Sequence, residues 1–224
     1  MRTAREASKA LAESWGKHLD RVASGEAAQI EHGNIRVIES VNKELSDEFE
    51  SFLNAAARSV KTGVQGLCSL LGIDIGFLFK KKSAFEFGIE RLRKVDAPLA
   101  SYLVECRKWS ERLILLRNDL EHEIWEFPKV KYSIGDGRVV AAEPSIGGEA
   151  ITILVDYLVD RVICFYEEMN AHALQRCLPD GTTIAEIAPQ MRVNEAPERF
   201  RITLAIGGED LWRIRYHVSR FDDT

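Results

Sequence analysis

The sequence predicts a mainly α-helical protein that carries a few short β-hairpins. Apolar residues recur every three or four positions over five separate stretches, which is the spacing of one face of a helix. Two shorter stretches alternate apolar and polar residues, which is the pattern of a strand with one buried face. Of the 224 residues, 46% are hydrophobic and 29% are charged, as expected for a globular protein with a substantial core.

The first two helices are expected near 4–24 and 35–61. The apolar face of the first consists of Ala4, Ala7, Leu11, Trp15, Leu19 and Val22. The apolar face of the second consists of Ile38, Val41, Leu45, Phe49, Phe52 and Ala56. Gly25 suits the end of the first helix. The stretch 63–82 is apolar and contains several glycines, so its pattern leaves open either short helices or a packed loop.

A shorter third helix is expected over 83–95. Ser83 and Glu86 have the spacing of a capping box, in which a hydroxyl and a carboxylate satisfy the free amides of a helix N-terminus. Asp96 follows and can cap the fourth helix, expected over 97–126. The apolar face of this fourth helix consists of Leu99, Tyr102, Cys106, Trp109, Leu113, Leu116 and Leu120.

The remaining chain predicts one more helix, over 149–177, and two hairpins. The first hairpin spans 129–142, because Asp136-Gly137 is a favoured two-residue turn between alternating strands. The second hairpin spans 199–218 at the C-terminus. We therefore expect an N-terminal helix and linker over 1–34, a helical domain over 35–178 and a β-containing appendage over 179–224.

Charge and cysteine content exclude several classes of protein. The net charge of -5 argues against a general nucleic-acid coating protein, so any nucleic-acid site must be local. The four cysteines form no close pair, which argues against zinc and against a disulfide framework and indicates buried free thiols. The N-terminus is charged, and the richest apolar run, 66–79, is short and broken by Asp74. We expect a cytoplasmic protein without a membrane segment, a metal or a cofactor.

One motif in the fourth helix carries chemistry. Asn118 and His122 are four residues apart and lie on one helical face, and the long side chain of Arg117 can reach them from the adjacent face. The stripe through Leu113, Leu116 and Leu120 is expected to point elsewhere into the core. Leu115 lies on the motif face, which suggests that this face meets another subunit.

This Arg-Asn-x-x-x-His string resembles the signature of HEPN (higher eukaryotes and prokaryotes nucleotide-binding) domains, as does its place near the end of a long helix. The resemblance covers roughly 35–177 and implies a bundle of four or five helices. It also implies a homodimer in which two motifs share a cleft that cuts RNA without a metal. Some family members act as toxins or defence effectors, so the resemblance also allows for an inhibitory antitoxin partner.

The resemblance implies a role for each residue of the motif. His122 would act as general acid or base, because an imidazole titrates near neutral pH. Arg117 would hold the scissile phosphate, because guanidinium matches phosphate oxygens in two-point geometry, and Asn118 would orient the phosphate or the imidazole. The products would be a 2′,3′-cyclic phosphate and a 5′-hydroxyl, because the substrate's own 2′-oxygen attacks.

Simpler interpretations stand beside this one. Arg117 could merely pair with Glu121 or Asp119, and His122 could interact with the helix dipole. The run Lys80, Lys81 and Lys82 could be a solvated turn or, with Arg91, Arg93 and Lys94, a local phosphate-binding patch. Trp125 could pack at the helix end or stack on a base. The sequence therefore predicts a metal-independent ribonuclease, with a non-catalytic helical module that binds RNA, nucleotide or protein as the alternative.

Overall fold

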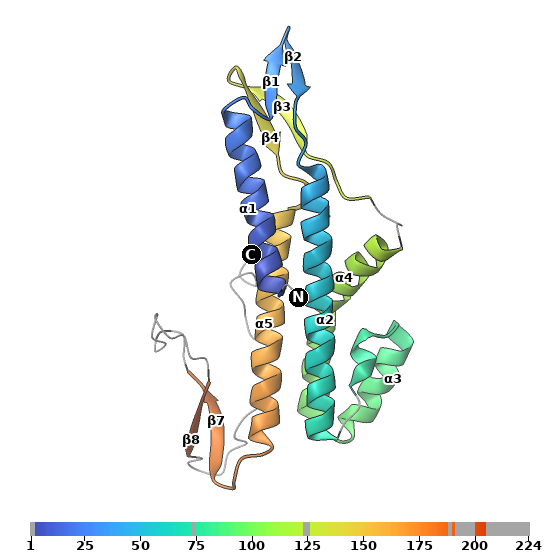
Figure 1. The fold of residues 1–224 in the computed structure, drawn as a ribbon. Helices are drawn as coiled ribbons and strands as arrows, with labels where there is room; N and C mark the ends of the chain where they lie inside the picture. The colour runs from blue at the N-terminus through green and yellow to red at the C-terminus, as the bar shows by residue number, and fades with distance from the viewer. Residues whose placement is uncertain (1–2, 73–74, 123–125, 188–189, 191–199, 205–224) are drawn as a thin grey trace. The chain divides into compact units, whose positions relative to one another are not determined.

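The computed structural model describes residues 3–72, 75–122, 126–187, 190 and 200–204 (Figure 1). Its helices are α1 (Ala4–Ala23), α2 (Asn42–Leu71), η1 (Gly76–Phe79), α3 (Lys82–Arg93), α4 (Ala97–Glu121) and α5 (Ile151–Gln175). Its strands are β1 (Ala28–Glu31), β2 (Asn34–Val37), β3 (Lys131–Gly135), β4 (Arg138–Ala142), β5 (Ser145–Ile146), β6 (Glu149–Ala150), β7 (Thr182–Glu186) and β8 (Phe200–Leu204). Consecutive strands pair into four antiparallel two-stranded sheets. The predicted fold class is confirmed at this level: the chain is mostly helical with a few short antiparallel strand pairs.

The chain divides into two compact units. Unit 1 comprises Met1–Ser59 and Arg112–Val162, and unit 2 comprises Val60–Glu111 and Ile163–Thr224, so that α2, α4 and α5 each contribute to both. The fully buried side chains of unit 1 include Leu11, Leu45, Phe49, Phe52, Leu113 and Leu154. Those of unit 2 include Ile75, Leu78, Leu99, Leu103 and Phe165. The domain boundaries expected from the sequence stay a prediction.

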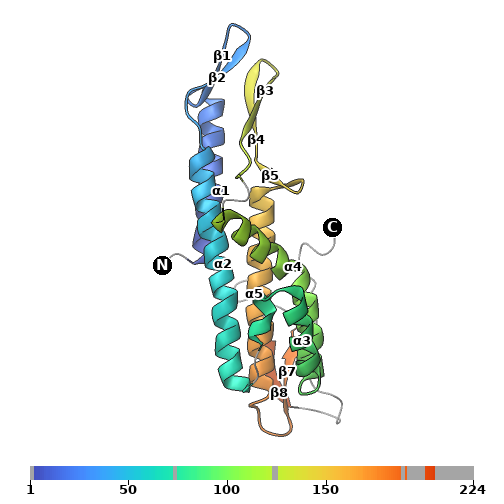
Figure 2. The same ribbon diagram turned by 90° about the vertical axis from the view of Figure 1, so that its right-hand side faces the viewer.

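Unit 1 contains two hairpins that lie side by side beyond the end of α1 (Figures 1 and 2). The β3–β4 hairpin confirms the predicted turn, because Asp136 and Gly137 both have positive φ angles, 50° and 73°. The β1–β2 hairpin was not predicted. Its turn uses His32 and Gly33 in the same conformation, with φ angles of 53° and 78°.

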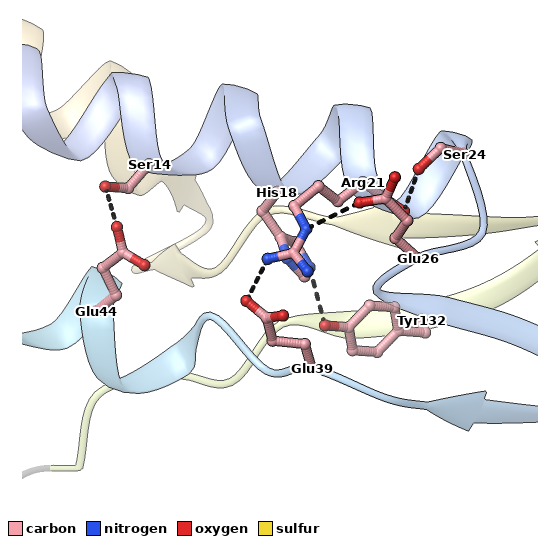
Figure 3. A network of polar contacts seen from close by, with 8 residues as sticks. All are labelled: Ser14, His18, Arg21, Ser24, Glu26, Glu39, Glu44 and Tyr132. Carbon is pink, nitrogen blue, oxygen red and sulfur yellow. Dashed lines mark hydrogen bonds and ion pairs between the residues drawn. The ribbon is translucent and has the colours of Figure 1, made fainter.

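Polar side chains tie α1 to the segments around it in unit 1 (Figure 3). Ser14 donates a hydrogen bond of 2.6 Å to Glu44 at the start of α2, and Arg21 pairs with Glu39. His18 Nε2 lies 2.9 Å from the hydroxyl of Tyr132 on β3. Burial, with the nearby charge of Arg21, lowers the pKa of His18. His18 is thus a buried residue that joins the helix to the β3–β4 hairpin.

In unit 2, α3 lies beside the first part of α4 (Figure 2) and packs its apolar face on η1. The ring of Phe77 lies so close to Gly88 that a Cβ there would be 2.1 Å from it. Arg107 of α4 lies over the ring of Phe85, 5.1 Å from its centroid, and donates to the carbonyl of Leu78 at 2.7 Å. The absence of a side chain at Gly88 therefore lets α3 and η1 approach each other.

Asp96 caps α4 as predicted. Its Oδ1 accepts a hydrogen bond of 3.1 Å from the backbone N–H of Leu99. Its Oδ2 lies 2.7 Å from His172 Nε2 on α5 and pairs with Arg176 just beyond that helix. Asp96 and His172 are both buried. The carboxylate therefore joins the start of α4 to the end of α5.

The helix boundaries differ from expectation at several points. Residues 35–37 belong to β2, and α2 begins only at Asn42 and continues through the glycine-containing stretch to Leu71. α3 begins at Lys82 with Lys81 as N-cap and no side-chain capping bond, so the capping box expected of Ser83 and Glu86 is wrong. Ser83 lies inside the first turn of α3, so its hydroxyl is not at the N-cap position from which it could accept hydrogen bonds from the free amides.

The C-terminal strand has a partner that was not predicted. β8 pairs with β7, in the register Thr182 opposite Leu204. The partner strand expected later in the predicted hairpin 199–218 lies outside the described residues. The cysteines also differ in part from expectation, because Cys106 is buried while Cys177 is exposed.

Candidate active site

The last turns of α4 carry the motif found in the sequence. Arg117 and Asn118 lie in the helix, whose last residue is Glu121 rather than 126 as predicted. His122 follows directly, and its backbone N–H donates 3.0 Å to the carbonyl of Asn118. Beyond the motif, Phe127 packs on the ring of Phe49 with centroids 5.6 Å apart. His122 thus stands at the C-terminal end of α4.

Arg117 lines a small pocket between α2 and α4 in unit 1. The pocket has a volume of about 90 Å³. Its lining consists of Glu50, Leu53, Asn54, Arg117, Leu120 and Glu121. Asn54 and Glu50 come from α2, more than sixty residues before the motif. The only sequence signal for Asn54 is that an amide interrupts the apolar run Phe52-Leu53, which by itself does not place it beside Arg117.

Three side chains contact the guanidinium of Arg117. Glu121 takes two contacts, with Nη1 to Oε2 at 2.8 Å and Nη2 to Oε1 at 3.0 Å. Nε donates 3.3 Å to Oδ1 of Asn54, and Nη1 donates 3.4 Å to Oδ1 of Asn118. The two-point contact with Glu121 is the geometry in which guanidinium also binds phosphate. The simpler interpretation from the sequence, an ion pair between Arg117 and Glu121, is therefore present in the structure.

His122 is exposed, and the structure does not join it to Arg117. Within the described residues its ring has no hydrogen-bonding or ionic partner. Asn118 is half-buried, and its side-chain oxygen accepts a hydrogen bond from Arg117. The motif therefore presents an imidazole open to solvent and a guanidinium occupied by a carboxylate.

The leucines of α4 are arranged differently from the predicted stripe. Leu113 is buried as expected, whereas Leu116 and Leu120 are only half-buried, and Leu120 lines the same pocket as Arg117. The expectation that Leu120 points away from the motif is wrong, because Leu120 lines this pocket together with Arg117 and with Leu53 of α2. Leu115 is 54% exposed, so the apolar position on the motif face is available for a contact.

The other residues expected to bind substrate lie elsewhere or outside the described chain. Lys80, Lys81 and Lys82 are exposed at the start of α3, which belongs to unit 2, whereas the Arg117 pocket belongs to unit 1. Trp125 lies outside the described residues. Among the residues that are described, no group of three or more His, Cys, Asp or Glu side chains is arranged to hold a metal ion.

The charges decide what this pocket can bind. It holds one guanidinium and two carboxylates, those of Glu50 and Glu121, so an anion can enter only if Glu121 turns away from Arg117. That contact is partly exposed, and such pairs contribute only about 0–1 kcal/mol. The amides of Asn54 and Asn118 could then turn their N–H groups toward the same anion. The arrangement can therefore become an anion site when Glu121 turns away, although the charge of Glu50 opposes the anion.

Comparison of the chain with models of protein families, with curated proteins and with solved structures found no match in any of the three. In the part of the chain that the structure describes, none of the helices combines the length and apolar character needed to cross a membrane.

Proposed function

We propose that the chain is a metal-independent endoribonuclease of the HEPN type that acts through Arg117, Asn118 and His122. The observation that carries the proposal is their arrangement at one end of α4. A solvent-exposed imidazole follows a guanidinium that lines a pocket and already binds an oxyanion, the carboxylate of Glu121, in two-point geometry. The function requires RNA and a neutral pH, so we place it in the cytoplasm.

The proposed chemistry is transesterification within the RNA chain. The 2′-oxygen of the ribose attacks the adjacent phosphorus and loses its proton to a base, while the 5′-oxygen of the next nucleotide leaves and gains a proton. His122 performs one of these proton transfers, because imidazole exchanges protons readily near neutral pH. Arg117 offsets the charge that develops on the phosphate oxygens. The products are a 2′,3′-cyclic phosphate and a 5′-hydroxyl, and no metal takes part.

A homodimer would complete this site. Each chain supplies one His122, whereas the reaction needs one group to accept a proton and one to donate it. An isologous contact through the face that carries Leu115 would bring two motifs together. An inhibitory partner protein, as the family resemblance allows, would act by covering the same face.

The decisive experiment compares two histidine variants in excess chelator with a mixed RNA substrate. His122→Asn should lower the cleavage rate by roughly 10²- to 10⁴-fold, the usual contribution of a positioned acid or base. His32→Asn is the matched control, because His32 lies in the β1–β2 turn with a positive φ that asparagine also adopts. RNA with deoxyribose at the scissile position should resist cleavage. Equal activity of the two variants would falsify the assignment of His122.

A second function is favoured by one observation. The guanidinium of Arg117 is engaged by Glu121, Asn54 and Asn118, as expected of a residue that joins α2 to α4 in a non-catalytic helical module. Such a module would bind RNA, a nucleotide or a protein without cleaving it. In that case the natural chain cleaves no RNA in the same assay, and Arg117→Gln lowers the midpoint of thermal unfolding. The same assays on the natural chain and its variants therefore distinguish the two functions.

A further inference from the structure

The segment 80–95, which contains α3 and the residues that flank it, concentrates positive charge in a chain whose net charge is -5. From residue 80 to residue 95 the sequence has six lysine and arginine residues against two glutamates, a local net charge of +4. The cations are Lys80, Lys81, Lys82, Arg91, Arg93 and Lys94, and all six are exposed. Of these, Lys82 is partly neutralised by Glu86, whose carboxylate lies 3.9 Å away. A surplus of this kind attracts polyanions even when the whole protein is acidic.

An exposed aromatic ring lies among these cations. Phe87 is 63% exposed and lies on the side of α3 opposite to its buried face, which consists of Phe85, Gly88, Ile89 and Leu92. The guanidinium of Arg91, one turn later, lies 5.9 Å from the centroid of the Phe87 ring. Packing within unit 2 therefore leaves Phe87 unexplained, whereas a flat ring beside cations is the usual surface for an unpaired base.

The structure holds this face in place. Besides the close approach of Phe77 to Gly88, Arg107 donates to the carbonyl of Lys80 at 3.1 Å and pairs with Glu111 at 2.7 Å. The lysines therefore extend from an anchored helix start. With twelve residues, α3 is about 18 Å long, which lets its cations contact several successive phosphates.

We propose that the outer face of α3, defined by Lys81, Phe87, Arg91 and Lys94, binds single-stranded RNA. Phe87 stacks on a base, and the three cations contact phosphates on both sides of it. The proposal rests on the proposed function for the choice of RNA as the polyanion, and it adds a binding surface separate from the cleavage residues. An anionic membrane is the weaker occupant, because an interfacial helix needs a broad apolar face and here only Phe87 and Val95 are apolar and exposed.

Binding is measured by fluorescence anisotropy, using full-length protein and a labelled unstructured RNA of about 20 nucleotides, longer than a typical single-stranded site. All proteins carry His122→Asn so that the probe stays intact. Phe87→Ser should weaken binding by roughly 5- to 150-fold, the range for loss of one stacked base. The triple variant Lys81→Gln, Arg91→Gln, Lys94→Gln should reduce the slope of log affinity against log salt by about 2, as loss of three phosphate contacts to a single strand predicts.

The matched control is a second triple variant, Lys9→Gln, Lys17→Gln, Lys43→Gln, which removes the same charge from exposed positions on α1 and α2. This control should retain most of the RNA affinity and the salt slope. Equal losses in the two triple variants would overturn the proposal, because the effect would then be one of net charge. Wild-type affinity in Phe87→Ser would overturn it as well. So would binding to phosphatidylserine vesicles that depends on α3, if RNA binding does not.

The test of RNA binding by α3 and the test of RNA cleavage by His122 can fail independently. Cleavage of a dinucleotide, which offers a single phosphodiester, tests the proposed roles of Arg117 and His122. If His122→Asn abolishes cleavage while the α3 variants bind RNA normally, only the binding surface is refuted. If the α3 variants lose RNA affinity while His122→Asn cleaves normally, only the catalytic assignment is refuted.

Discussion

At the scale of single residues, the candidate site is controlled by Glu121. The carboxylate lies one turn after Arg117 and takes the two guanidinium contacts that a phosphate would need. Because both side chains are partly exposed, the ion pair stabilises the helix little, and its main consequence is competition with an entering anion. Removal of the charge should therefore affect binding more than folding.

Glu121→Gln should raise RNA affinity by about twofold to fivefold and leave thermal stability nearly unchanged, because an exposed pair contributes at most about 1 kcal/mol. Asp47→Asn is the matched control, since Asp47 forms an exposed pair with Lys43 at the same spacing on α2. Anisotropy with the His122→Asn background measures both. Equal gains in the two variants would indicate a general charge effect, and a lower affinity in Glu121→Gln would refute the competition.

A second residue-scale prediction concerns Asp96. Burial raises the pKa of this carboxyl, but hydrogen bonds from His172 and Leu99, with the charge of Arg176, outweigh burial and lower the pKa below its ordinary value of 3.8. The folded state then binds fewer protons than the unfolded state near this pH. Asp96 therefore stabilises the fold above about pH 4, and this stabilisation is lost as the pH falls through the lowered pKa.

Asp96→Asn should lower the free energy of unfolding by about 2 kcal/mol at pH 7, because the amide keeps the helix cap but removes the charge that faces His172 and Arg176. Urea denaturation of both proteins from pH 7 down to about pH 2 gives the difference at each pH. We expect the difference to shrink below about pH 4. A difference that stays constant to the lowest pH would show that the charge of Asp96 does not stabilise the fold.

At the scale of elements, the periodicity of apolar residues predicted the helices well, but it failed where the residues of a turn were not recognised. Residues 35–41 were assigned to a helix because Ile38 and Val41 continue the spacing of α2, yet Ile38 is exposed and residues 35–37 pair with β1. The turn between β1 and β2 is His32-Gly33, and histidine is less typical there than asparagine or aspartate. Asp136-Gly137, a typical turn, was recognised. Local sequence predicts such hairpins only where the turn residues are the common ones.

The candidate site shows the same limit. The motif and its place at the end of α4 could be predicted, because Arg117, Asn118 and His122 are close in sequence. The partners from α2 could not, since Asn54 meets Arg117 only through packing of two helices far apart in the chain. The pairing of β7 with β8 depends in the same way on contacts between distant segments.

The close packing of α3 on η1 gives an element-scale prediction. Gly88→Ala should destabilise unit 2 by about 1–3 kcal/mol, because its methyl group would lie 2.1 Å from the Phe77 ring and force the two elements apart. Gly66→Ala is the matched control in the same unit, since nothing lies within 4 Å of its added Cβ and alanine favours a helix by roughly 1 kcal/mol. Thermal unfolding followed by circular dichroism should move in opposite directions for the two variants. A stabilised Gly88→Ala would contradict the packing.

At the scale of the whole molecule, charge is distributed unevenly. The chain is acidic overall, whereas the α3 segment carries a net charge of +4. An acidic protein repels RNA at long range except near such a segment, and salt weakens that attraction steeply. This distribution agrees with the two proposals. The face of α3 would bind RNA, and the end of α4 would cleave it with residues that need little additional positive charge.

The oligomeric state is the last prediction at this scale. Leu115 is more than half exposed on the helix that carries the motif, and an apolar residue at this place suits a symmetric contact between two copies. We expect sedimentation velocity at micromolar concentrations to show a dimer. Leu115→Glu should shift it toward monomer, because each copy would place a carboxylate opposite its own symmetry mate. Leu19→Glu, a matched change at an exposed leucine on α1, should leave the dimer intact.

If the two motifs form one cleft, Leu115→Glu should also lose RNA cleavage and regain it as protein concentration rises, since mass action restores the dimer. A monomer that cleaves RNA at the wild-type rate would show instead that one copy of Arg117 and His122 suffices.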